Sequence, residues 1–377
     1  MDKFLRNTYF LFFLLYSFVG SVFEGSGIIT YFSIGIQVII GLICFAKTLS
    51  MQKTFLYITW TLLFLMNTTW YFFSDFTNAY NIDVYKGIGL CALSFYPAFY
   101  FSQKKLLSNN FLIVFILIYT ISSYSLYTTF FLEQATKETT NNFSYLFVSV
   151  LPFVFLFPNK RIVLSFTYMF FLTFLVIQGA KRGAIIITVF INLFWLIYLI
   201  FYQKVNIKEL CMVSLSCIIA GLILKQFILN SDYLMRRYEI TLLGNYSGRD
   251  EIYSKILSTW LNCNDSIFYL FGRGFAATYS IFGTAAHNDW LELLFNNGVL
   301  GVILYFTVIL SVFKMIYEKK FSREKRYIIF AILFSWFLSS IFSMFYSSIN
   351  KAPLIILLVY LSESSHQILI SSKSNVK

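Results

Sequence analysis

Residues 162–202 read IVLSFTYMFFLTFLVIQGAKRGAIIITVFINLFWLIYLIFY. Two apolar runs flank a short interruption, GAKRG at residues 179–183, which carries two adjacent cations. About 20 mostly apolar residues are needed to cross a hydrocarbon layer of about 30 Å. Each run is close to that length, so the stretch predicts two membrane-spanning helices joined by a tight, charged connection.

The rest of the chain has the same character. Of its 377 residues 58% are hydrophobic and 12% are charged, whereas about a quarter of the residues in a soluble domain are charged. This composition excludes a soluble enzyme, and the even spread of apolar residues argues against a soluble domain held by one anchor. We therefore expect an all-α fold, a polytopic transmembrane helical bundle in which residues 1–377 form a single integral membrane domain.

Apolar runs predict about twelve spans. They lie near residues 8–25, 28–46, 54–73, 87–102, 111–131, 144–158, 162–178, 183–202, 209–228, 293–313, 327–345 and 352–368. The spans at 87–102 and 144–158 are short and are the weakest. The first run is interpreted as a retained span, because no A-x-A cleavage site of a secretory signal follows it.

Basic residues give the orientation. If the N-terminus is cytoplasmic, eighteen of the 29 Lys and Arg residues fall on the inner side, and six of the other eleven belong to one long segment that escapes the positive-inside rule. We expect a multi-pass protein of the plasma membrane with both termini cytoplasmic and residues 229–290 forming a large extracytoplasmic loop. The net charge of +12 is then explained by topology, and no nucleic acid partner is predicted.

The long loop is predicted to contain an amphipathic helix that begins at Arg249. Apolar residues recur at helical spacing from Ile252 to Trp260. Ser247 and Asp250 have the spacing of a capping box, which would hold Arg249 near the start of the helix. An alternative is a helix that lies on the membrane surface, with Arg249 contacting lipid headgroups.

A second helix is predicted to begin near residues 285–292 and to stop or kink at Gly298. His287 lies at its start, where the loop meets the membrane. Imidazole has a near-neutral pKa, so His287 could take a proton from an incoming hydroxyl group. The alternative is that His287 is simply a polar residue at the membrane edge.

Lys181 and Arg182 place two cations on the predicted outer side, against the positive-inside trend. Their positions suggest either a phosphate-bearing ligand or contacts with lipid headgroups. Arginine can hold phosphate oxygens with a bidentate fork, so several arginines could together bind a diphosphate. The candidates are Arg182, Arg249, Arg236, Arg237 and Arg273. The cysteines have neither CxxC nor metal-ligand spacing, and we expect no disulfide, no metal and no cofactor.

Four motifs follow one another on the predicted outer side. They are GAKRGA at 179–184, SGR at 247–249, GRGF at 272–275, and HNDWL at 287–291 followed by NGVLG at 297–301. In this order they resemble the O-antigen polymerase and O-antigen ligase superfamily, in motif detail over residues 165–315 and elsewhere only in topology. The resemblance implies a GT-C-like bundle of ten to fourteen helices with a large external loop, which transfers glycans from a polyprenyl diphosphate carrier.

The resemblance also assigns roles. Arg182, Arg249 and His287 match the R-G, S-G-R and H-N positions of the family, whereas Lys181 stands where the family often has Ser. The resemblance thus suggests that Arg182 and Arg249 stabilise the departing diphosphate and that His287 activates the acceptor. Asn288 and Asp289 could orient His287 or the substrate.

The leading hypothesis is therefore a polysaccharide repeat-unit polymerase for capsule, exopolysaccharide or O-antigen. Its partners would be a polyprenyl-diphosphate-linked oligosaccharide and membrane lipid, with a flippase and a chain-length regulator as candidate protein partners. The alternative within the superfamily is a ligase that transfers the glycan to a lipid, a peptidoglycan or a protein. A transporter or lipid flippase is a third hypothesis, but its charges would usually lie within the membrane rather than at one external loop.

Overall fold

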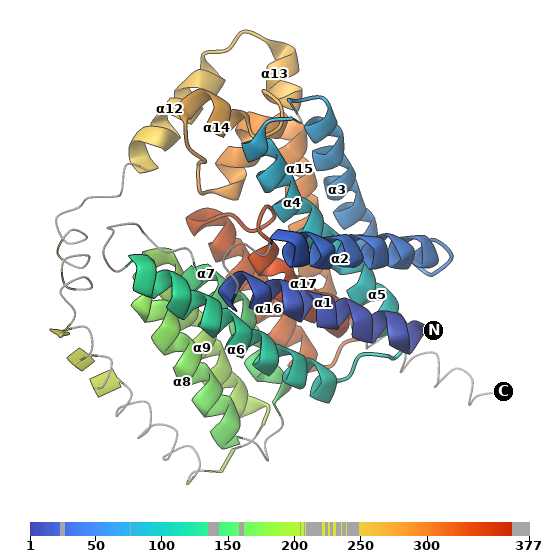
Figure 1. Ribbon diagram of the computed structural model, residues 1–377, viewed down its shortest axis with the longest axis vertical. Helices are drawn as coiled ribbons and strands as arrows, with labels where there is room; N and C mark the ends of the chain where they lie inside the picture. Colours follow the sequence, from blue (N-terminus) through green and yellow to red (C-terminus); the bar gives the residue numbers. More distant parts are fainter. Residues whose placement is uncertain are drawn as a thin grey trace.

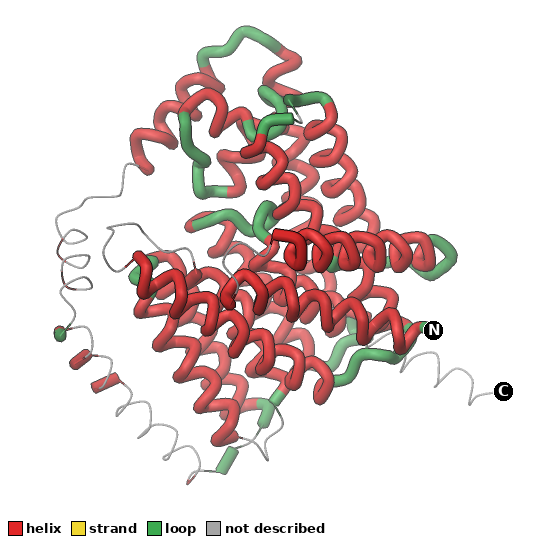
Figure 2. The backbone as a smooth tube through the Cα atoms, in the orientation of Figure 1, coloured by secondary structure: helices red, strands yellow, loops and turns green. Residues whose placement is uncertain are grey.

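The computed structural model describes residues 1–22, 27–75, 77–134, 143–157, 162–203 and 249–363, with isolated positions between 205 and 239. Within these ranges the chain forms helices and connecting loops, without a strand (Figure 2). The expected all-α fold is thus confirmed for the part of the chain that the structure describes.

The helices follow the predicted apolar runs. Their bounds are α1 (Asp2–Val22), α2 (Gly27–Thr48), α3 (Phe55–Phe72), α4 (Ala79–Leu93), α5 (Phe95–Gln103), α6 (Asn109–Gln134), α7 (Phe143–Val150), the 3-10 helix η1 (Leu151–Leu156), α8 (Ile162–Gln178), α9 (Arg182–Phe201), α12 (Arg249–Leu261), α13 (Ser266–Phe271), α14 (Ala277–Phe282), α15 (Asp289–Tyr317), α16 (Arg323–Phe342), the 3-10 helix η3 (Ile349–Lys351) and α17 (Ala352–Glu363). In Figure 1, α12, α13 and α14 lie together at one end of the bundle, above the ends of α3, α4 and α15.

Four of these helices are long and apolar enough to cross a membrane: α2, α9, α15 and α16. Shorter apolar helices cover Asn109–Ser125, Phe143–Leu156 and Ile162–Gln178. The protein is therefore a helical membrane protein, whereas the number of twelve spans is not established. The predicted span at 209–228 falls largely outside the described residues, as does the end of the last one.

The two weakest predicted spans are both interrupted. The run at 87–102 divides at Ser94 into α4 and α5, and the Ser94 hydroxyl donates to the Cys91 carbonyl at 2.6 Å. The run at 144–158 changes from α7 to η1, where Pro152 lies in the first turn. A hydroxyl that bonds the preceding turn and a proline without an N–H both weaken a continuous α-helix.

The predicted outer connections meet one another at one end of the bundle. The Trp70 indole donates to the Phe271 carbonyl at 2.8 Å, and the ring of Tyr80 stacks on that of Tyr279 at 3.5 Å. These contacts join the end of α3 to α13 and the start of α4 to α14. The part of the long loop that contains α13 and α14 is therefore packed on the helix ends.

The predicted inner connections also meet one another. Lys47 forms a 3.0 Å ion pair with Asp2, and the Gln103 amide donates to the Glu363 carboxylate at 3.1 Å. Arg6 donates to the Leu106 carbonyl at 2.6 Å. Segments that are predicted to lie on the inner side are thus in contact with one another, and their side of the membrane stays a prediction.

Large aromatic side chains fill the space between the helices. Trp336 is fully buried and stacks on Phe345 with ring centroids 4.5 Å apart. Trp60 stacks on Phe95 and meets Trp336 edge to face. This cluster ties α3, α5, α16 and the loop after α16 together, and so fixes the position of the loop that borders the candidate site.

Candidate functional site

The GAKRG segment makes a tight turn between α8 and α9. Ala180 has a left-handed backbone with φ of +50°, and Arg182 is the first residue of α9. A Cβ atom on Gly183 would collide with the Tyr145 hydroxyl and with Phe342. Glycine therefore lets the start of α9 approach α7 and the end of α16 closely, which places Lys181 and Arg182 at that junction.

Arg249 reaches the same junction from the long loop. It is the first residue of α12, as predicted, and its guanidinium donates to the Phe342 carbonyl at 3.0 Å. The Tyr145 hydroxyl donates to the same carbonyl at 2.9 Å. The predicted cap residue Ser247 lies outside the described residues, whereas the shared carbonyl holds Arg249 beside α7 and α16.

His287 lies close to these cations. Its side chain is half-buried, and the positive charges of Arg249 and Lys181 act on it. Burial, together with these two cations, lowers the pKa of His287 to about 4. His287 is therefore neutral near pH 7 and can accept a proton. The structure thus brings together three residues that are far apart in the sequence.

The backbone of His287 is left-handed, with φ of +53°. This conformation is unfavourable for a residue with a Cβ atom, so the surroundings must hold it in place. The next residue, Asn288, caps α15, because its side-chain oxygen Oδ1 accepts from the backbone N–H groups of Trp290 and Leu291 at 3.0 and 3.1 Å. Its amide also donates to the Ile341 carbonyl at 3.2 Å.

Asp289, the first residue of α15, is fully buried. Its carboxylate accepts from the Phe345 backbone N–H at 2.9 Å and from the Tyr305 hydroxyl at 2.7 Å. Lys351 is close enough for its charge to act on Asp289. These contacts give Asn288 and Asp289 a role in holding the loop and the helix start, and their direct contact with a substrate stays a prediction.

Glu292 holds the other side of the same loop. One carboxylate oxygen accepts from the Ala286 backbone N–H at 2.7 Å. The other accepts from the Thr278 hydroxyl and from the Asn296 amide. Because Ala286 directly precedes His287, this buried carboxylate helps to fix the backbone on which the histidine is presented.

The GRGF and NGVLG motifs pack against each other. Gly298 has φ of +65° and interrupts α15, as the predicted kink requires. The backbone N–H groups of Arg273 and Gly274 donate to the carbonyls of Phe295 and Asn296, at 2.9 and 3.0 Å. Both motifs therefore provide close backbone contact between the long loop and α15.

Arg273 makes its side-chain contacts within the long loop. Its guanidinium lies over the Phe268 ring, 4.3 Å from the centroid, and donates to the Cys263 sulfur at 3.6 Å. Its side chain is exposed, and its contact with a diphosphate stays a prediction. Arg236 and Arg237 lie outside the described residues. Among the described residues, no group of three His, Cys, Asp or Glu side chains could hold a metal ion.

Sequence reasoning missed the residues that connect the site. Lys351 is almost fully buried, and its ammonium donates to the Tyr145 carbonyl at 3.3 Å. The Phe342 carbonyl accepts hydrogen bonds from both Tyr145 and Arg249. A single lysine before the last apolar run was the one available signal, because a carbonyl group has no signature in the sequence.

The chain was also compared with known proteins. No protein-family model matches it, and no curated protein shows significant similarity to it. The arrangement of its own residues is therefore what supports a functional interpretation.

Proposed function

We propose that this protein is a membrane glycosyltransferase that polymerises polysaccharide repeat units, using a polyprenyl-diphosphate-linked oligosaccharide as donor. The observation that carries the proposal is the neutral His287 beside Arg249 and Lys181. A group that can accept a proton thus lies next to cations that can bind an anion. Transfer of a sugar from a diphosphate to a hydroxyl group requires both functions.

In the proposed reaction, the oxygen of an acceptor hydroxyl forms a bond to the anomeric carbon of the donor sugar. The bond from that carbon to the diphosphate oxygen breaks, and the electron pair leaves with the carrier diphosphate. His287 takes the proton of the hydroxyl. Arg249, Lys181 and Arg182 meet the negative charge that develops on the leaving group, which lowers the barrier.

Binding of the diphosphate to Arg249 and Lys181 would also change the pKa of His287. Burial lowers the pKa of His287 to about 4, and the same two cations that would bind the diphosphate contribute to this shift. A bound diphosphate offsets their charge, and so raises the pKa of His287 toward its ordinary value and makes the imidazole a stronger base. Donor binding and activation of the acceptor are thereby coupled.

The proposal is tested by deleting the gene and weighing the carrier-linked glycans by mass spectrometry. The strain is complemented with the wild type, with His287→Ala, with Arg249→Ala and with Lys255→Ala. Lys255 serves as a matched control, because it lies in the same helix as Arg249 and its exposed side chain pairs with Glu251. Membrane levels of each variant are measured by immunoblotting.

Single repeat units should accumulate in the deletion strain and in both site variants, while Lys255→Ala restores polymer. Loss of Arg249 should reduce polymerisation by about 10²- to 10³-fold, as for other groups that stabilise charge in a transition state. Long carrier-linked chains in the deletion strain would instead indicate the ligase. Full rescue by both site variants with an unchanged lipid pool would contradict glycan transfer and favour a transporter.

A further inference from the structure

The short helix α13 in the long loop presents an exposed apolar face. Ile267, Leu270 and Phe271 are 70%, 53% and 40% exposed, and their spacing places them on one side of the helix. On another side, Phe268 is buried and its ring packs edge to face on that of Phe295. A helix that is apolar both toward the protein and away from it does not suit an aqueous loop. Such a face marks contact with a partner or with a membrane.

The end of α13 adjoins the membrane-facing surface of α15. Exposed apolar side chains recur along α15 at helical spacing, at Leu300, Ile303, Phe306, Leu310 and Phe313. Because α15 is long and apolar enough to cross a membrane, this row of side chains faces lipid. The row begins two residues after Gly298, where the backbone of α15 closely approaches that of Leu270 and Phe271.

The end of α3 brings a second row of exposed apolar side chains to α13. The exposed apolar residues of α3 include Ile58, Leu62, Leu65 and Phe72. The Trp70 indole in the last turn donates to the Phe271 carbonyl at 2.8 Å, and the two rings lie 5.9 Å apart. In Figure 1, α13 accordingly lies at the end of α3. Tryptophan is typical of the membrane boundary, because its ring is apolar and its N–H group is polar.

Charged residues border the apolar face of α13 and do not interrupt it. The Asp265 carboxylate caps the start of the helix by accepting from the Ile267 N–H at 2.9 Å. Arg273, which is exposed, follows the end of the helix. An apolar face between charged residues is typical of a helix at the boundary between headgroups and acyl chains. A second copy of the chain could also cover this face, but the bilayer is the partner that already covers the rows on α3 and α15.

We propose that α13 lies at the boundary of the bilayer, in the leaflet on the side of the candidate site. Ile267, Leu270 and Phe271 contact acyl chains there, and Asp265 and Arg273 remain among the headgroups. The long loop is therefore partly inserted in the membrane. This assignment does not depend on glycan transfer.

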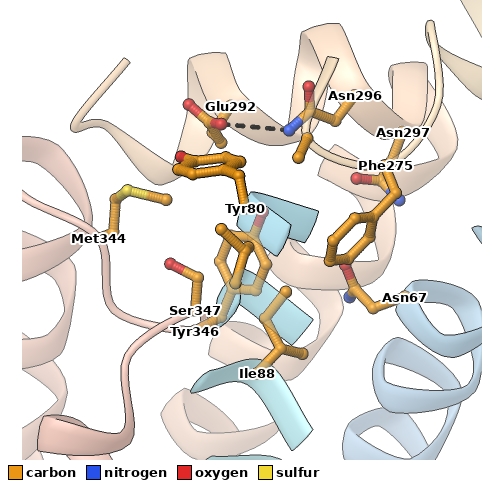
Figure 3. Close-up of a pocket in the computed structure, with 12 residues that line it drawn as sticks. Asn67, Tyr80, Ile88, Phe275, Glu292, Asn296, Asn297, Met344, Tyr346 and Ser347 are labelled. Carbon is orange, nitrogen blue, oxygen red and sulfur yellow. Dashed lines mark hydrogen bonds between the residues drawn. The ribbon is translucent and has the colours of Figure 1, made fainter. Parts of the chain in front are cut away.

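α13 is fixed to the part of α15 that supports the candidate site. The Gly274 N–H donates to the Asn296 carbonyl at 3.0 Å, and the Asn296 amide donates to the Glu292 carboxylate at 3.2 Å (Figure 3). Glu292 accepts from the Ala286 N–H, directly before His287. The insertion of α13 therefore sets the level of His287 relative to the lipid headgroups.

The test identifies what contacts α13 in the native membrane of cells that express the full-length protein. The photoreactive residue p-benzoylphenylalanine replaces Ile267 or Leu270, and after illumination the purified protein is examined by intact-mass spectrometry. Ile303, in the exposed row of α15, is the lipid-facing reference position. Ser254, on the exposed polar side of α12, is the aqueous reference position. Because all four side chains are exposed, the replacements should not disturb folding, and melting temperatures verify this.

We expect a mass shift of one phospholipid at Ile267 and at Leu270, with a yield close to that at Ile303, and no such shift at Ser254. Absence of the lipid adduct from both α13 positions in folded protein, while Ile303 forms it, would place α13 in water and overturn the proposal. A mass shift of a second protein chain at these positions would assign the face to another copy and would overturn it as well.

Discussion

His287 is held in a protonation state as well as in a position. Burial and the charges of Arg249 and Lys181 lower its pKa to about 4, whereas the unfolded chain has the ordinary histidine value of about 6.5. As the pH falls below 6.5, the unfolded chain binds the proton first, so the folded state loses stability down to about pH 4. At the residue scale, His287 therefore makes the folded protein sensitive to acid.

We predict that His287→Asn reduces this acid sensitivity. Asparagine tolerates a left-handed backbone and does not titrate. From pH 7 to pH 5 the wild type should lose about 2 kcal/mol of unfolding free energy through His287, and the variant should not. Melting temperatures of the purified proteins at the two pH values measure the difference. Equal losses in both proteins would show that the histidine titrates normally.

A second residue-scale prediction concerns Tyr305. Its hydroxyl donates to Asp289 at 2.7 Å and accepts from the Trp336 indole at 2.8 Å. Tyr305→Phe leaves both buried partners without this hydrogen bond, and each such loss costs about 1–3 kcal/mol. Thermal unfolding should detect a destabilisation of about 2–4 kcal/mol. Thr307→Val, which removes a hydroxyl that bonds only its own helix, serves as a control and should be nearly neutral.

At the scale of elements, the kink at Gly298 in α15 makes room for the backbone of Leu270 and Phe271 in the long loop. A Cβ atom on Gly298 would lie 2.5 Å from the Leu270 carbonyl, in addition to the strain of φ at +65°. Gly298→Ala should therefore separate the loop from the helix, and we expect a loss of more than about 3 kcal/mol of stability. A melting temperature equal to that of the wild type would contradict this account.

Gly283→Ala is the matched control for Gly298→Ala. Gly283 also has a left-handed backbone, with φ of +72°, but nothing lies within 4 Å of the added Cβ atom. The control isolates the backbone strain, which is about 1–2 kcal/mol. The difference between the two variants measures the packing of the loop on α15.

Patterns within a short stretch of sequence correctly predicted several helices and one kink. Apolar length predicted α8 and α9, and helical periodicity predicted the start of α12 at Arg249. Glycine chemistry predicted the kink at Gly298. The breaks at Ser94 and Pro152 were not predicted, because continuous hydropathy hides a change of helix geometry.

The contacts within the candidate site could be predicted from the sequence only in part. The motifs identified Arg249 and His287. The carbonyl that holds Arg249, however, belongs to Phe342, and Tyr145 and Lys351 complete this hydrogen-bonded group from two other segments. Tertiary proximity of this kind leaves no periodic pattern. Asn288 shows the same limit, since its amide bonds the Ile341 carbonyl at the end of α16.

At the scale of the whole molecule, the sequence predicts that the connections alternate between the two sides of the membrane. His287, Arg249 and Lys181 belong to the set that the distribution of basic residues predicts to be extracytoplasmic. We predict that a membrane-impermeant maleimide labels Cys263 in spheroplasts. Cys263 is partly exposed in the long loop, whereas Cys44 and Cys91 are buried.

Cys263→Ser provides the control for this labelling, because it leaves every other cysteine in place. Labelling should be lost in that variant and should not require permeabilisation in the wild type. Labelling that appears only after the membrane is opened would reverse the orientation. The proposed site would then face the cytoplasm.

The left-handed backbone of His287 has a consequence for protein engineering. Ala180 and Ala276 share this conformation, with φ of +50° and +53°, and glycine would relieve the strain at all three positions. Two of them lie in the segments that present the candidate catalytic groups. Directed evolution for heat resistance alone should therefore accumulate glycine here, and at position 287 the more robust protein would have lost its proton acceptor.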